Sequence, residues 1–225
     1  MRREHNIQET TDEWDLIIDM PLDGNITNLT GLYTQSGSPS SWVTDPSDST
    51  RQVACFNTKT PVIYPDYNFQ LNQSVYANKF KMSLDFWKIN YSSGSHPNII
   101  DSSYGGGWQT SGGLGIVGQC TSRSTWAFGV SSVHSDTYIN VSKNLIPQHT
   151  WFNYFLQYYD NYIDIVITNL QTGVVVAEKH GSVATGYSLD LNESRTKIQL
   201  GSNNQWSDDR GAYSYLRNFK MWLHK

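Results

Sequence analysis

The sequence predicts an all-β protein folded as a sandwich of two antiparallel sheets. Residues 80–88 alternate between apolar side chains on one face and polar ones on the other, which is the period of a strand with one buried face. Similar segments recur through the chain, and no stretch keeps a helical period. The alternation breaks at Trp87, an aromatic residue on the face that should meet water, so we expect curved sheets that leave aromatic side chains at a surface. The recurring segments are 151–158, 162–168, 174–179, 198–201 and 215–223.

Turn-forming residues between these segments support the predicted strands. The first, 14–20, is closed by Pro21 and an Asp23-Gly24 turn. Residues 169–173, Asn-Leu-Gln-Thr-Gly, form a hairpin loop in which Gly173 can take a positive φ. The remaining strands are expected at 52–57, 80–89, 113–117, 149–154, 161–168, 197–202 and 211–222.

Length and composition indicate one globular domain. The 225 residues contain no Pro/Gly/Ser-rich linker, charge run or internal repeat, so we expect a polar arm over 1–13 and a single domain over 14–225. The net charge of −4 and the scattered basic residues argue against nucleic acid as a partner. Apolar runs of about five residues are too short to span a membrane. A low charged fraction of 16% suits neutral, hydroxyl-rich ligands, although loop-rich β proteins often have such a composition.

The first residues do not read as a secretory signal, because no apolar stretch follows Arg2 and Arg3. Two expectations remain: a signal was removed before this numbering begins, or the protein leaves its cell by another route, as virion proteins do on lysis. Cys55 lies in a strand-like run, where a buried free thiol is the ordinary interpretation; a disulfide with Cys120 is the alternative.

The order of motifs resembles the laminin-G-like branch of the concanavalin A-like jelly rolls over residues 14–223. The resemblance implies a two-sheet antiparallel jelly-roll sandwich in which strand 16–20 pairs with the last strand. The family includes lectins and hydrolases, so activity has to be argued from residues. Sugar or ion contacts made by the relatives' hairpin turn do not carry over, because residues 169–173 differ from it. The matching positions are Ala54, Phe56, Phe80, Ser83, Phe86, Trp87, Trp151, Gly201 and the strand 216–223.

Catalytic patterns are missing from the sequence, and we predict that the protein is not an enzyme. Jelly-roll glucanases place their carboxylates as Glu-x-Asp-x-x-Glu on one strand, and none of the five glutamates here belongs to such a motif. Asp160 and Asp164 flank a hairpin strand and are expected to be solvated. A polysaccharide-cleaving enzyme that uses an Asp pair is the least favoured hypothesis.

Two loops are candidate ligand sites. In 102–110, three glycines separate Tyr104 from Trp108, and Gln109 follows. Glycines allow close backbone approach, while an aromatic ring can stack on a sugar and an amide can meet its hydroxyls. The alternative is a plain strand connection with Trp108 at the edge of the core.

The second candidate loop, 202–211, contains Trp206, Asp208, Asp209 and Arg210. Asp208 and Arg210 could bind a sugar diol beside the Trp206 ring. Asp208 and Asp209 could instead hold Ca²⁺, the one cofactor considered, although no Asp-x-Asp-x-Asp spacing supports it. An Asp–Arg pair that caps a surface turn is an equally good interpretation.

Trp126 shares a strand face with Phe128 and Val130. That face is interpreted as core; if it lines a concave sheet instead, Trp126 is a ligand platform.

The leading hypothesis is a non-catalytic glycan-binding module displayed outside the cell or on a virus particle, where it binds a glycan or glycoprotein receptor. The alternative is a structural or decoration protein of a bacteriophage virion, in which residues 1–13 dock onto other virion proteins.

Overall fold

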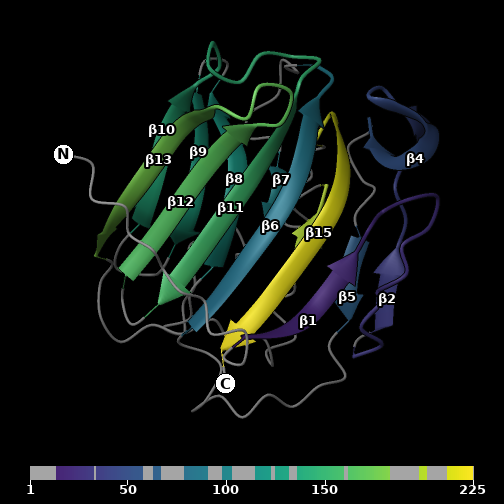
Figure 1. Cartoon of the computed structure of the whole chain (residues 1–225), viewed down its shortest axis with the longest axis horizontal. Coiled ribbons are helices and arrows are strands. Elements are labelled where there is room, and N and C mark those ends of the chain that lie inside the picture. The colour runs from purple at the N-terminus through teal and green to yellow at the C-terminus, as the bar shows by residue number, and fades with distance from the viewer. Residues whose placement is uncertain are drawn as a thin grey trace.

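In the computed structural model, every regular element among the described residues is a β-strand (Figure 1). The structure describes residues 14–32, 34–57, 63–66, 79–90, 98–102, 115–122, 125–131, 136–159, 162–182, 198–201 and 212–224.

Two antiparallel sheets form the molecule, with sheet A in front of sheet B in Figure 1. Sheet A runs in the order β13 (Val175–Ser182), β12 (Tyr162–Asn169), β11 (Trp151–Tyr159), β6 (Lys79–Lys88), β15 (Ser214–His224), β4 (Asp48–Phe56) and β3 (Ser41–Asp45), and β1 (Trp14–Met20) also pairs with β15. Sheet B runs in the order β10 (Asp136–Ser142), β9 (Thr125–Ser131), β8 (Gly115–Ser122), β7 (Asn98–Asp101), β14 (Gln199–Leu200), β5 (Ile63–Asp66) and β2 (Thr34–Gly37).

This architecture confirms the predicted all-β sandwich. The predicted pairing of the first and last strands is also confirmed, since β1 runs antiparallel to β15 with Trp14 opposite His224 and Met20 opposite Phe219. The hairpin turn after β12 has the expected positive φ of 69° at Gly173. Pairing of strands so distant in sequence ties both ends of the domain to the same sheet.

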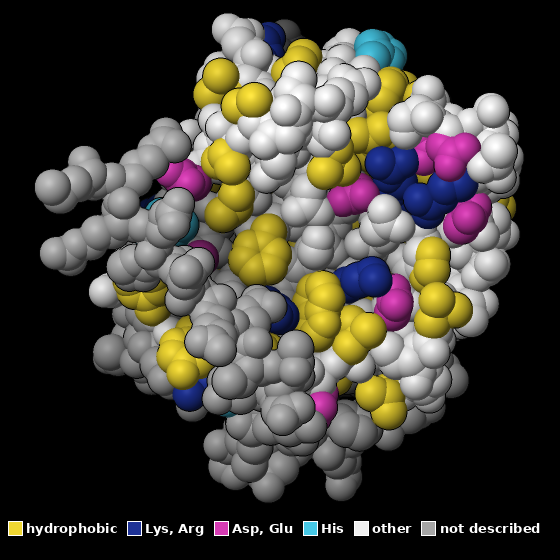
Figure 2. All heavy atoms as spheres, viewed as in Figure 1, with side chains coloured by type: hydrophobic (Ala, Val, Ile, Leu, Met, Phe, Trp, Pro, Cys, Tyr) yellow, Lys and Arg dark blue, Asp and Glu magenta, His cyan; other side chains and the backbone are white. Residues whose placement is uncertain are grey.

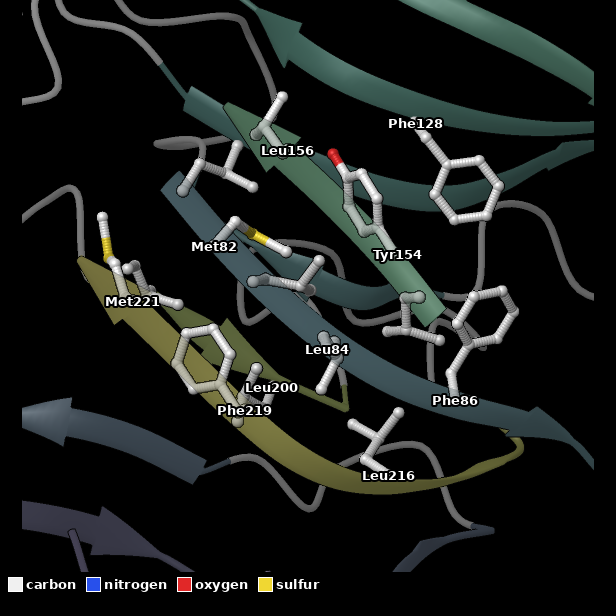
Figure 3. Close-up of a cluster of buried hydrophobic side chains, with 14 of the residues drawn as sticks. Met82, Leu84, Phe86, Phe128, Tyr154, Leu156, Leu200, Leu216, Phe219 and Met221 are labelled. Atoms are coloured by element: carbon white, nitrogen blue, oxygen red, sulfur yellow. The ribbon is translucent and has the colours of Figure 1, made fainter. Parts of the chain in front are cut away.

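The core lies between the two sheets (Figure 3). Met82, Leu84 and Phe86 of β6 point into it, as the alternation predicted. Tyr154 brings a hydroxyl into this apolar layer, where it donates a hydrogen bond to the Val117 carbonyl at 3.0 Å. Burial raises the pKa of Tyr154 far above its usual value, so the phenol stays neutral and serves as a donor.

Trp126 belongs to this core and is fully buried. Its ring stacks on Phe128, with centroids 5.5 Å apart, and lies 5.6 Å from Phe86. The core interpretation therefore holds, and Trp126 is not an exposed ligand platform. β9 belongs to sheet B, and its apolar face packs inward against sheet A.

Trp87 corrects another expectation, because its side chain is only 8% exposed. It points to the opposite side of sheet A from Phe86 and makes an edge contact with Trp151 at 5.6 Å. Val53 joins the two indoles in a small second cluster, and Val43 and Tyr215 pack against it. Side chains of β3, β4 and β15 cover a ring that the strand pattern alone assigns to solvent.

Cys55 and Cys120 are both buried free thiols, which confirms the free-thiol interpretation of Cys55. Burial raises the pKa of the Cys55 thiol, so it remains protonated. Among the described residues, no helix has the length and apolar character needed to cross a membrane.

Candidate functional site

The two loops singled out from the sequence fall largely outside the described residues. Tyr104, Trp108, Gln109, Trp206, Asp208, Asp209 and Arg210 all belong to this undescribed part, so the proposed sugar and Ca²⁺ contacts stay predictions.

The structure describes the residues at the ends of both loops, and a backbone hydrogen bond joins the two ends of each loop. Ser102 donates its backbone N–H to the Ile116 carbonyl at 3.0 Å, and Ala212 donates to the Gly201 carbonyl at 2.7 Å. β7 leads into the first loop and β14 into the second. These strands are antiparallel neighbours, with Asp101 opposite Gln199, so the two loops leave from opposite ends of the pair. The fold therefore does not bring their starting points together.

A different surface combines aromatic, amide and charged side chains. It is the outer face of sheet A, which consists of the side chains of that sheet that point away from sheet B. Figure 2 shows hydrophobic side chains over the middle of this face, with charged ones beside them toward β15 and β4. Strand register aligns its residues in rows. One row holds Lys220, Ser83 and Phe155, and the next holds Trp222, Lys81 and Gln157.

Phe155 is the central feature of this face. It lies in the middle of β11, is partly exposed, and makes no contact with another ring or a cation in the described part of the chain. Asn153 and Gln157 flank it two residues away on the same face of the strand. The Gln157 amide forms no hydrogen bond with the described residues. An open ring between two amides can stack on the apolar side of a sugar while the amides meet its hydroxyls.

The Asn153 amide is held in one orientation. Its Nδ2 donates to Ser83 Oγ at 2.7 Å and to Asp85 Oδ1 at 2.8 Å. An ionised carboxylate only accepts hydrogen bonds, so the NH₂ group must face Asp85. The Oδ1 of Asn153 is consequently the atom left to accept a bond from a ligand.

Asp85 is fixed in turn by β15. Arg217 Nε donates to Asp85 Oδ2 at 3.3 Å, and Asn218 Nδ2 donates to the same oxygen at 2.8 Å. Both side chains reach Asp85 because the register shifts between Arg217 and Lys220, where Asn218 takes a φ of 53°. Asparagine tolerates this left-handed conformation better than most residues.

Arg217 also binds a second carboxylate, that of Asp45. It thereby links Asp85 and Asp45 in one network, the Arg217 network, at the end of the face. Its Nη1 pairs with Asp45, and its guanidinium lies 4.0 Å above the Trp151 ring. Trp151 Nε1 donates to Asp45 Oδ1 at 3.1 Å. Burial acts to raise the pKa of Asp45, but hydrogen bonds from Ser47 and the Arg217 charge outweigh it, so the pKa lies below its usual value.

An aromatic band borders the other end of the face and is made of Trp14, Trp222, His224 and Tyr159. Lys81 Nζ lies 4.9 Å from the Trp14 centroid and 5.3 Å from the Trp222 centroid. His224 makes edge contacts with Trp14 at 5.0 Å and with Tyr159 at 5.9 Å. His224 therefore links the rings of Trp14 and Tyr159, and Lys81 links Trp14 to Trp222.

Toward β13 the outer face carries acidic side chains that are exposed to solvent. His180 Nδ1 lies 2.7 Å from Asp164 Oδ1 and Nε2 lies 3.6 Å from Glu178. The hydrogen bond with Asp164 is the main reason that the pKa of His180 is raised. Asp160, the suggested partner of Asp164 in catalysis, lies outside the described residues. In the described ranges, no three His, Cys, Asp or Glu side chains are arranged to hold a metal ion.

Comparison with solved structures shows the fold at low sequence identity. Domain 4 of an extracellular arabinanase from Geobacillus stearothermophilus, solved with arabinotriose, matches with a TM-score of 0.60 and 13% identity over 95% of this chain and 94% of that domain. The enzymatically active domain of tailspike protein 2 from bacteriophage CBA120 matches with a TM-score of 0.60 and 12% identity over 86% of this chain but only 29% of that domain. The CBM2 module of the evolved Dit protein of Lactobacillus casei BL23 phage J-1 matches with a TM-score of 0.55 and 10% identity over 94% of this chain and 96% of that chain. No protein-family model matches the sequence, and neither does any curated protein.

Sequence reasoning missed the outer face. Phe155 and Gln157 lie in a segment recognised as a strand, and Phe155 stands among its polar positions. An aromatic residue between the two amides Asn153 and Gln157 on the polar side of the strand was the available signal.

Proposed function

We propose that this protein is a non-catalytic glycan-binding module whose ligand lies on the outer face of sheet A. The observation that carries the proposal is the open Phe155 ring between the Asn153 and Gln157 amides, all three on one central strand. Strands hold side chains more rigidly than loops do, so little ordering is needed when a ligand binds.

The Arg217 network supports binding without catalysis. Glycoside hydrolysis requires one carboxylic acid with a raised pKa beside a second carboxylate. Asp45 and Asp85 share a guanidinium, and the pKa of Asp45 is lowered, so the pair is suited to hold structure. Asp85 contributes by orienting Asn153.

The similar structures favour display outside the cell or on a virus particle. A phage tailspike, a phage Dit module and a domain of an extracellular arabinanase share this fold. Membership of the laminin-G-like branch belongs to the same proposal, whereas docking of residues 1–13 onto other virion proteins belongs to the alternative of a structural role. A purely structural virion role is the second candidate, and it predicts assembly without any glycan binding.

Glycan-array screening of the full chain tests the function, with Phe155→Ala and Gln157→Ala as site variants. Leu29→Ala is the control, because Leu29 is 63% exposed on a loop outside the face. We expect array binding by the wild type, at least about tenfold weaker binding by both site variants, and no change in the control. Binding that survives both site variants but is lost in Trp108→Ala or Trp206→Ala would place the site in the loops predicted from sequence. No binding to any glycan would reject the function.

A further inference from the structure

We propose that the outer face of sheet A binds an extended glycan chain along its length, and not a single terminal sugar. This inference rests on the glycan-binding function proposed above and specifies its ligand class. It follows from the spacing of two partly exposed rings, Phe155 on β11 and Trp222 on β15.

The two rings stand too far apart for one sugar. Phe155 and Trp222 are separated by two strand spacings and by one two-residue step along the strands, because Trp222 lies opposite Lys81 and Lys81 lies opposite Gln157. Neighbouring strands are ~4.8 Å apart and two residues advance ~6.8 Å, so the Cα atoms are roughly 12 Å apart. Stacked rings have centroids about 4.5–7 Å apart, so one pyranose can stack on only one of the two side chains.

The space between the rings is polar and suited to a middle sugar. The line from Phe155 to Trp222 crosses β6 between Ser83, which is opposite Phe155, and Lys81, which is opposite Trp222, and Gln157 lies beside this line, opposite Lys81. The Gln157 amide offers donors and an acceptor that the described residues do not use. Lys81 contributes its alkyl stem, while its ammonium lies between two rings, 4.9 Å from the Trp14 centroid and 5.3 Å from the Trp222 centroid.

Two rings with the polar side chains of Ser83 and Lys81 between them and the Gln157 amide beside them therefore match a chain of roughly three sugar units crossing from β11 to β15. Asn153 Oδ1 extends the polar contacts on the other side of Phe155. A site for one terminal sugar would use a single ring and leave the second without a role in binding.

Isothermal titration with linear oligosaccharides of one to six units tests the inference. Gluco-, galacto-, arabino- and N-acetylglucosamine series are used on the wild type, Phe155→Ala, Trp222→Ala and Trp222→Phe. Tyr162→Ala is the control, because Tyr162 is 44% exposed on β12 and lies off the line between the rings. Thermal unfolding of each variant confirms that it is folded.

We expect affinity in one series to rise by about tenfold or more from one to three or four units and then to level off. Both Ala variants should weaken hexasaccharide binding by about tenfold and remove the gain with length, while Trp222→Phe restores much of it and Tyr162→Ala changes nothing. Equal affinity for monosaccharide and hexasaccharide, or loss in only one of the two Ala variants, would overturn the extended-chain inference and leave glycan binding intact. Failure of all four series while branched glycans bind on the array would also overturn it. Failure of both the series and the array would reject the function itself.

Discussion

Replacing Arg217 by methionine should destabilise the protein strongly, because this side chain neutralises two buried carboxylates. Asp45 and Asp85 are 2% and 7% exposed, and both bind the guanidinium. Methionine keeps a long apolar stem against Trp151 but removes the charge. Breaking a buried ion pair typically costs 3–5 kcal/mol, and since the Arg217 side chain is 13% exposed we take the lower end, about 3 kcal/mol.

The stability lost in the Arg217→Met variant should depend on pH in a defined direction. Asp45 has a folded-state pKa below its ordinary value of 3.8, so its stabilising contribution is complete at neutral pH and is lost as the pH falls through the lowered pKa. Without Arg217, burial is opposed only by the hydrogen bonds from Ser47 and Trp151, and the pKa of Asp45 rises. At low pH the Asp45 carboxyl of the variant becomes protonated. This removes a buried charge that no longer has a cation beside it, so the variant loses less stability there. The stability gap should be widest near pH 7 and narrow below about pH 4.

Urea and thermal unfolding, followed by tryptophan fluorescence at pH 7 and pH 3.5, measure this gap. A change of about 3 kcal/mol corresponds to a melting temperature roughly 6–12 °C lower for a chain of this length. Arg51→Met is the matched control. Arg51 pairs with Asp23 at 3.6 Å, the two side chains are 26% and 43% exposed, and Arg51 reaches the network only through a 3.3 Å hydrogen bond to Asn218 Oδ1, so we expect a loss of about 1 kcal/mol or less. Equal losses for Arg217→Met and Arg51→Met, or a gap that does not change with pH, would refute this account of the network.

Three further predictions concern the scaffold. Gly201→Ala should cost more than about 2 kcal/mol in urea unfolding, because φ is +89° and the added Cβ would lie 2.0 Å from a Phe56 ring carbon; Gly173→Ala, at φ +69° with open space, should cost about 1 kcal/mol, and equal costs would contradict the packing argument. Tyr154→Phe should lose about 1 kcal/mol through the bond to Val117 while remaining folded, and an unchanged melting temperature would show that this bond contributes nothing. A chain ending at residue 211 lacks β15, which pairs with β1, β4 and β6, and should be insoluble or unfolded by circular dichroism; a soluble fragment with a cooperative melt would contradict the topology.

The long strands could be predicted from the sequence because their inward faces follow a clean two-residue period. Met82, Leu84 and Phe86 are all buried where that period places them. The short strands carried too little signal. β2 and β7 have four residues each, and β5 contains Pro65, which weakens any strand prediction because proline lacks an N–H donor.

The candidate site was harder to predict because it depends on contacts between distant segments. Trp87 was assigned to a surface, yet Val53 and Trp151 cover it. Asp45 meets Arg217 across 172 positions in sequence. A strand pattern separates two faces, but it does not say which outward residues another segment will cover.

The register shift in β15 explains how one strand serves both the core and the outer face. Regular alternation after Leu216, which points inward, would bring Asn218 and Lys220 inward as well. The shift between Arg217 and Lys220 inserts one residue, so that Phe219 and Met221 enter the core while Lys220 and Trp222 turn outward. Arg217 and Asn218 then reach Asp85 together, and Asp85 orients Asn153 beside Phe155. One bulge thus positions the Trp222 ring and, through Asp85, the amide that flanks the Phe155 ring.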